Sequence, residues 1–239
     1  MTATGLAPAT ALRLERSGRW LRVRFPSPHR TLGWTILGGG WQTCEAVSWL
    51  EVTADELAPP VDPRTFAREG LAAEGRGEEP VLLTGCALDH HVKATATVGA
   101  VTAACVATVG LGNALRAGDS PRTSPPVNTI NLLCAVTRPL TDVALLEALS
   151  IAVEARTAAV LEAQLRSSAS RGMATGTGTD CVVVAAPLPQ IAVGSGAAIA
   201  SCAEYAGKHT EVGAAIGAAV LDAVAKGVAE WCERHLRTT

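Results

Sequence analysis

The chain has 239 residues, of which 48% are hydrophobic and 18% charged. That composition excludes a disordered protein, and the length is sufficient for a large buried core. Twenty Lys and Arg stand against 22 Asp and Glu, so the chain lacks the basic excess that is typical of nucleic-acid or membrane-surface binding. Only 3% of the residues are aromatic, which leaves few platforms for stacking bases.

The cysteines and the apolar stretches predict a cytoplasmic protein without a membrane segment. The seven cysteines are widely spaced and form no C-x-x-C pair, which argues against a disulfide framework or a thiolate zinc site. No basic segment followed by an apolar one opens the chain, so no secretory signal is expected. Residues 94–115 and 181–203 lack charge for long enough to span a membrane. Thr and Gly in the first and prolines in the second favour buried strands and loops instead.

The first half of the chain predicts mainly strands. Residues 11–25 alternate apolar and charged side chains on either side of Ser17-Gly18, which predicts a hairpin with one solvent-exposed face. A helix is expected at 63–73, with a proline at its start. Apolar or β-branched runs between turn signals predict further strands at 31–37 (stopped by glycines 38–40), at 46–52, at 81–84, and two within 95–109 that join near Gly99.

The second half predicts longer helices. A strand at 129–137 precedes a helix at 141–165, which Thr141 or Asp142 caps. A buried strand at 181–186 and a helix at 210–235 follow. Because strands cluster early, helices come later, and only one strand-helix-strand unit occurs, we predict an α+β fold. Its sheet is expected to be mostly antiparallel or mixed, covered by helices, in a single compact domain.

The segment with the densest chemical signal is ATGTGTD at 174–180. Alternating glycines let the backbone approach a ligand, and Thr hydroxyls with exposed N–H groups can hold carbonyl or phosphate oxygens. The segment leads into a strand and has no following Lys, which disfavours a nucleotide-binding loop. A plain glycine turn is the alternative interpretation.

Two further residues are candidates for acid–base chemistry. Glu154 has Ile151, Ala158 and Leu161 at helical spacing, so we expect its carboxylate on an apolar helix face, where desolvation raises a carboxyl pKa. His209 precedes the last predicted helix, whose N-terminus disfavours the imidazolium form. The alternatives are a half-buried Glu paired with an Arg, and an ordinary surface His.

Other polar groups give weaker signals. Asn131 in the strand at 129–137 could donate to a substrate carbonyl, although an Asn bonding a turn is equally ordinary. Asp89-His90-His91 invites a metal interpretation, but adjacent strand residues point to opposite faces, so no metal site is predicted. Neither a G-x-S-x-G elbow nor an H-E-x-x-H helix occurs.

An ordered series of motifs resembles the adenosylcobinamide amidohydrolase family. It comprises Gly38-Gly39-Gly40, TVGLGNA at 108–114, Thr129-Ile130-Asn131, VEART at 153–157, ATGTGTD at 174–180 and AGKHTEVG at 206–213. The family pattern usually reads Thr-Glu-Ala-Lys where this chain has Val153 and Arg156, and Gly where it has Asn128. The domain that the resemblance implies covers residues 31–236, with residues 1–30 as an N-terminal hairpin of the same domain.

The resemblance implies hydrolysis of the aminopropanol amide of adenosylcobinamide, giving adenosylcobyric acid and 1-amino-2-propanol in corrinoid salvage. On this reading Glu154 or His209 activates water and Asp180 orients the His, which makes these three the predicted catalytic residues. The predicted substrate-binding residues are Asn131, Thr175, Gly176, Thr177, Gly178, Thr179 and Thr210. No cofactor is predicted, because the corrinoid with its cobalt is the substrate, and metal dependence stays open.

The expected partner is therefore a small molecule, with neither nucleic acid nor membrane, and a homo-oligomer is left open. Two alternatives remain: a corrinoid-binding protein without catalysis, motivated by Val153 and Arg156, and an amidase that acts on another amide. A nucleotide-binding protein that shares only the fold is disfavoured by the missing Lys after the Gly/Thr segment.

Overall fold

One mixed sheet organises the computed structural model, which describes residues 12–121, 128–189 and 201–236. Its eight strands follow the order β4-β3-β2-β10-β8-β6-β5, with β1 paired to β2. β10 runs parallel to β8, and β3 runs parallel to β4, while the other pairs are antiparallel. The strands are β1 (Arg13–Ser17), β2 (Trp20–Trp34), β3 (Gly40–Glu51), β4 (Val81–Thr84), β5 (Val92–Val98), β6 (Val101–Val109), β8 (Ile130–Val136) and β10 (Cys181–Pro187).

The remaining elements are helices and a small ribbon. β7 (Ala114–Leu115) and β9 (Gly176–Thr177) form a separate two-stranded antiparallel ribbon. The helices are α1 (Pro63–Ala73), α2 (Asp142–Glu162), α3 (Glu211–Leu236) and two short 3-10 turns, η1 (Asp55–Leu57) and η2 (Leu88–His90). The predicted α+β class with a mixed sheet covered by helices is confirmed.

β2 folds the sheet back on itself. Its first part pairs with β1 and the end of β3, and its last part pairs with β10 and the start of β3. The register shifts between Arg24 and His29, where Pro26 and Pro28 interrupt the ladder. The sequence predicts a hairpin strand and a separate strand at 31–37 here. That division is wrong, because the chain bends at the prolines and remains one strand.

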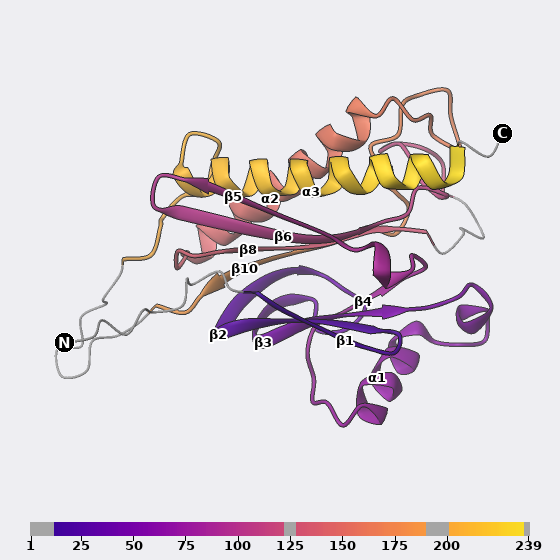
Figure 1. Cartoon of the computed structure of the whole chain (residues 1–239), viewed down its shortest axis with the longest axis horizontal. Helices are drawn as coiled ribbons and strands as arrows, with labels where there is room; N and C mark the ends of the chain where they lie inside the picture. The colour runs from indigo at the N-terminus through magenta and orange to yellow at the C-terminus, as the bar shows by residue number, and fades with distance from the viewer. Residues whose placement is uncertain (1–11, 122–127, 190–200, 237–239) are drawn as a thin grey trace.

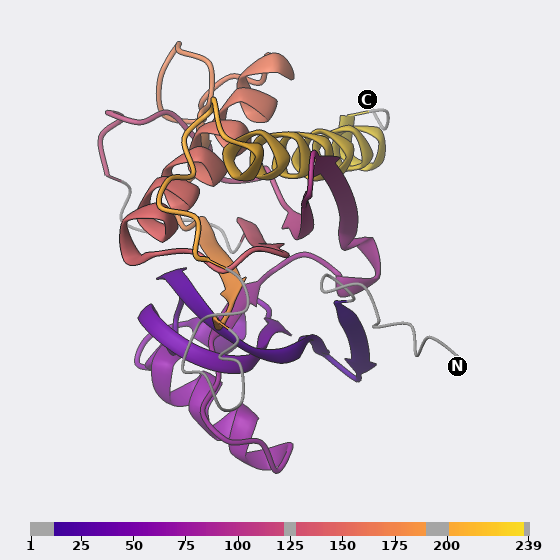
Figure 2. The same ribbon diagram turned by 90° about the vertical axis from the view of Figure 1, so that its left-hand side faces the viewer.

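The folded sheet gives layers with cores between them (Figure 1). α2 and α3 cover one face of the β5-β6-β8-β10 half, where the largest apolar cluster lies. Apolar side chains of β1, β2 and β3 pack against the other face of that half. α1 covers the outer side of the β3-β4 region, and Figure 2 shows it on the side of the molecule opposite α2 and α3. β8 is buried along its whole length because both of its faces are covered.

Local signals set the helix starts as predicted. The Asp62 carboxylate caps α1 by accepting from the Thr65 backbone N–H at 3.0 Å, and Pro63 occupies the first turn. The Thr141 hydroxyl caps α2 by accepting from the Ala144 N–H at 3.2 Å. The predicted helix at 63–73, the strand at 81–84 and the pair of strands around Gly99 are confirmed.

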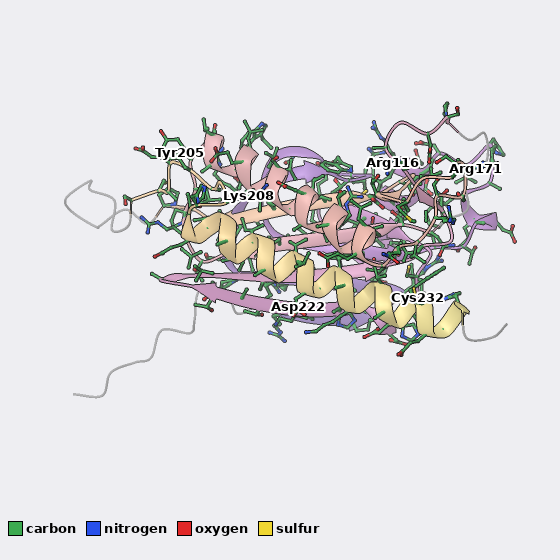
Figure 3. All side chains as sticks on the ribbon, turned by 90° about the horizontal axis from the view of Figure 1, so that it is seen from above. Arg116, Arg171, Tyr205, Lys208, Asp222 and Cys232 are labelled. Atoms are coloured by element: carbon green, nitrogen blue, oxygen red, sulfur yellow. The ribbon has the colours of Figure 1, made fainter. Side chains whose placement is uncertain are left out.

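α3 is long and apolar enough to cross a membrane by length and composition, with a mean hydropathy of 1.6. In this protein 56% of that window is buried, and α3 packs along the sheet beside α2 (Figure 3). The core helix of a globular protein has the same character.

Candidate active site

Polar side chains lie close together where the end of β4 approaches β6 and the start of β8. The Asn131 amide at the start of β8 donates to the Leu83 carbonyl of β4 at 2.6 Å, and the Thr129 hydroxyl donates to the Asn131 amide oxygen at 3.3 Å. The hydroxyls of Thr108 in β6 and Thr84 in β4 lie 3.4 Å apart. The four polar side chains are buried, and their hydrogen bonds join the two layers at this end.

Asp180, directly before β10, is the hub of this end. One carboxylate oxygen accepts from the Ile130 backbone N–H at 3.0 Å and from the Thr177 hydroxyl. The other accepts from the Thr177 N–H at 3.0 Å and from the Arg156 guanidinium. Both side chains of the ion pair are buried, with 7% of Asp180 and 10% of Arg156 exposed. The carboxylate is therefore saturated by the protein, which suits it to hold the segment in shape.

The Arg156–Asp180 ion pair leaves no room for a side chain at position 176. A Cβ at Gly176 would overlap the Arg156 guanidinium and the Asp180 carboxylate. Arg156 also donates to the Thr175 carbonyl at 3.3 Å, and the Thr175 hydroxyl accepts from the Ala117 N–H at 2.8 Å. We call Thr175, Gly176, Thr177, Gly178, Thr179, Asp180, Arg156 and Asn131 the loop cluster.

Asn113 lies beside the loop cluster and was not among the predicted site residues. It is fully buried, and within the described chain neither its amide nitrogen nor its amide oxygen has a hydrogen-bond partner. A Cβ at Gly178 would come within 2.8 Å of the Asn113 amide nitrogen, so the backbone of the loop lies directly over it. The signal that could have identified Asn113 was its position in the TVGLGNA segment, whose glycines permit close packing.

The other predicted residues lie at the surface of the α2–α3 layer. Lys208 pairs with Glu154, and 66% and 55% of their side chains are exposed. His209 is exposed, and the Thr210 hydroxyl accepts from the Gly213 N–H at 3.0 Å at the start of α3. We call Glu154, Lys208, His209 and Thr210 the helix-face group. The expectation that Glu154 is embedded in an apolar face is wrong, because its side chain points from α2 toward the exposed segment before α3.

The structure thus divides the predicted site residues into two groups. Within the described chain, no hydrogen bond or ion pair joins Asp180 to His209, so the expected orienting contact is not formed. Figure 3 shows Lys208 and Arg116 at separate positions along the helices. Arg116 donates to the Met173 carbonyl at 3.2 Å and so marks the side of the loop cluster.

A cavity of about 660 Å³ opens beside the turn between β2 and β3. It is lined by that turn with Gly38 and Gly39, by Arg64 and Arg68 of α1, and by the segment around Arg76. Trp34, which precedes the cavity-lining Thr35, donates its indole N–H to the Asp180 backbone carbonyl. The cavity could not be predicted from the sequence, because its walls come from separate segments of the chain.

The thiols at this end are held in the protonated form. Burial raises the pKa of Cys181 to about 12, and the neighbouring Asp180 carboxylate adds to that shift. Burial also raises the pKa of Cys86. A thiolate nucleophile is therefore disfavoured at neutral pH. Among the residues that the structure describes, no three His, Cys, Asp or Glu side chains lie together as metal ligands would.

Comparison with known proteins decides the family. The family model described as adenosylcobinamide amidohydrolase matches residues 6–236. The chain belongs to the adenosylcobinamide amidohydrolase family. Its relative from Halobacterium salinarum, named adenosylcobinamide amidohydrolase, is 35% identical over 202 residues, which span 80% of this chain and 76% of the relative.

Two solved structures are also similar to this member of the adenosylcobinamide amidohydrolase family. A Pyrococcus horikoshii protein has a TM-score of 0.48 at 13% identity and covers 94% of this chain and 80% of its own. An L-aminopeptidase D-Ala-esterase/amidase from Ochrobactrum anthropi, titled a variant among the Ntn hydrolase fold, has a TM-score of 0.44 at 13% identity. It covers 91% of this chain and 82% of its own.

Proposed function

We propose that the protein hydrolyses the amide between aminopropanol and the corrin ring of adenosylcobinamide. Water adds its hydroxyl to the acyl carbon, the C–N bond breaks, and the amine leaves with a proton. The products are adenosylcobyric acid and 1-amino-2-propanol, a step in corrinoid salvage. The observation that carries the proposal is the family match over residues 6–236, which includes both the loop cluster and the helix-face group.

Amide hydrolysis needs donors for the oxyanion, an activated water and a proton for the leaving amine. We assign the donors to the loop cluster, where Gly178 and Thr179 are exposed in the turn before β10. Asp180 holds that turn in shape and is a positioning residue, since the protein occupies both of its carboxylate oxygens. Glu154 or His209 is the proposed water-activating residue, as the sequence predicts. Both belong to the helix-face group, which no hydrogen bond or ion pair joins to the loop cluster in the described chain, so variants of the two residues test this assignment by themselves.

The corrin body is proposed to occupy the cavity beside the β2–β3 turn. Its volume of about 660 Å³ falls in the range of small-molecule sites, roughly 300–1,000 Å³. The glycine turn permits close approach, and the exposed side chains of Arg64 and Arg68 offer donors for the carbonyl oxygens of the corrin carboxamides, whereas Arg76 already pairs with Glu74. The hydrogen bond from Trp34, the residue before the cavity-lining Thr35, to the Asp180 carbonyl supports this assignment.

A cytoplasmic location is proposed together with this function. All seven cysteines are unpaired, which suits a reducing compartment. The proposed partner is the small-molecule corrinoid alone, without nucleic acid or membrane, and the oligomeric state is a matter for measurement.

The direct test incubates purified protein with adenosylcobinamide and follows both products by mass spectrometry, with and without a chelator. Release of adenosylcobyric acid and aminopropanol supports the proposal, and loss of release with the chelator would establish a metal requirement. Corrinoid binding without release would favour the non-catalytic alternative. If amine is released from a simpler amide but not from adenosylcobinamide, the protein is better described as an amidase that acts on another amide.

A further inference from the structure

Asn113 is the one side chain near the loop cluster whose hydrogen-bonding groups are both buried and unused in the described chain. Buried amides are almost always hydrogen-bonded, because leaving both groups without partners costs folding free energy. The neighbouring Asn131 shows the ordinary case, since both its amide nitrogen and its amide oxygen have partners. The unused amide of Asn113 thus contributes nothing visible to stability.

The cover over Asn113 is thin. Gly178 lies against the Asn113 amide nitrogen, and Gly178 is itself exposed to solvent. The backbone of an exposed glycine therefore lies directly against this buried amide. Hydrogen bonds between Thr177 and Asp180 fix the two ends of the turn. Between them, in the described chain, neither the Gly178 N–H nor the Thr179 N–H makes a hydrogen bond. A displacement of the Gly178 backbone would therefore break none of the hydrogen bonds of the Asp180 carboxylate.

We propose that Asn113 is a catalytic residue that binds the scissile amide when Gly178 moves aside. An Asn carboxamide offers a donor and an acceptor, which match the carbonyl oxygen and the N–H of a substrate amide. Its N–H groups would hold the carbonyl oxygen more strongly as negative charge develops there in the transition state. The inference rests on the proposed amide hydrolysis and adds the residue that receives the amide.

The decisive variant is Asn113→Leu, which keeps a similar shape and removes the unused amide. We expect kcat for adenosylcobinamide to fall about 10²–10³-fold, as for loss of one oxyanion donor, with KM changed less than about threefold. The Tm of the free protein should stay the same or rise by a few degrees, because an unpaired buried amide is removed. A residue with a purely structural role would show the opposite pattern, a lower Tm with kcat retained.

Two further variants keep the test decisive. Asn113→Asp preserves the shape and loses the donor, so kcat should again fall. Trp49→Phe is the matched control. Within the described residues the Trp49 indole N–H is also buried and unpartnered, but it lies in the apolar cluster that β1, β2 and β3 form against the sheet, away from the loop cluster. It should leave kcat within about twofold. Retained kcat in Asn113→Leu, or unfolding of both Asn113 variants, would overturn the proposal.

The inference and the proposed function fail in distinguishable ways. If the wild-type protein releases no aminopropanol from adenosylcobinamide, the proposed function is wrong whatever the variants do. If the wild-type protein is active and Asn113→Leu is equally active, only the role of Asn113 is wrong.

Discussion

The loop cluster and the helix-face group differ in how the protein uses their charged side chains. In the loop cluster, Asp180 and Arg156 are buried, and four hydrogen bonds saturate the carboxylate. In the helix-face group, Glu154 and Lys208 form an ion pair whose two side chains are more than half exposed. A saturated carboxylate is poorly placed to activate water, whereas an exposed one contributes little to folding. The two groups should therefore separate stability from activity.

The largest expected effect is that of Asp180→Ala. This change leaves the Arg156 charge buried without its partner, which should cost about 3–5 kcal/mol of unfolding free energy. The Gly/Thr turn would lose its anchor, so hydrolysis should also be lost. Thermal and urea unfolding measure the first effect, and product release measures the second. The matched control is Glu154→Ala, which removes an exposed carboxylate and should cost less than about 1 kcal/mol.

The next prediction is a loss of activity with no change in stability. If Glu154 activates the water, Glu154→Gln should lower kcat by about 10²–10⁴-fold, while the Tm stays within about 2 °C of the wild type. His209→Ala is the parallel variant, and the one with the larger fall in kcat identifies the water-activating residue. Wild-type kcat in both variants would confine the chemistry to the loop cluster and remove the helix-face group from the mechanism.

The sequence predicted most of the fold because its signals were local. Asp62 with Pro63 and Thr141 set the starts of α1 and α2, and the run at 129–137 was apolar enough to identify β8. The bend in β2 was not predicted, because Pro26 and Pro28 are equally typical of a loop between two strands. Only the pairing of β2 with both β1 and β10 shows that they lie within one strand.

The site was predicted less completely, for reasons of geometry. The motif of alternating Gly and Thr identified the loop at the centre of this cluster, because glycines without a Cβ indicate a backbone that is closely approached by other groups. The sequence could not show that Asp180 would pair with Arg156, because that contact depends on how α2 packs over β10. Asn113 was missed because burial without a hydrogen-bond partner is a property of the folded state alone.

A smaller effect tests why the loop cluster requires glycine. Gly176→Ala should destabilise the protein by about 1–3 kcal/mol through overpacking, since its Cβ would overlap the Arg156–Asp180 pair. Gly207→Ala, next to the helix-face group in the sequence, is the matched control, because no atom lies within 4 Å of the added Cβ. Chemical unfolding of both variants measures the difference. Equal stability would mean that the loop cluster is looser than its hydrogen bonds indicate.

The smallest expected effect is the coupling between Glu154 and Lys208. A double-mutant cycle with Glu154→Gln and Lys208→Met isolates this pair, because the double variant corrects for the loss of each side chain by itself. Its coupling energy in unfolding should lie between about 0 and 1 kcal/mol, as for exposed ion pairs, and should shrink further at high salt. A coupling of several kcal/mol would show that the helix-face group is held as firmly as the loop cluster. Glu154 would then be a structural residue, and the division of stability from activity between the two groups would be wrong.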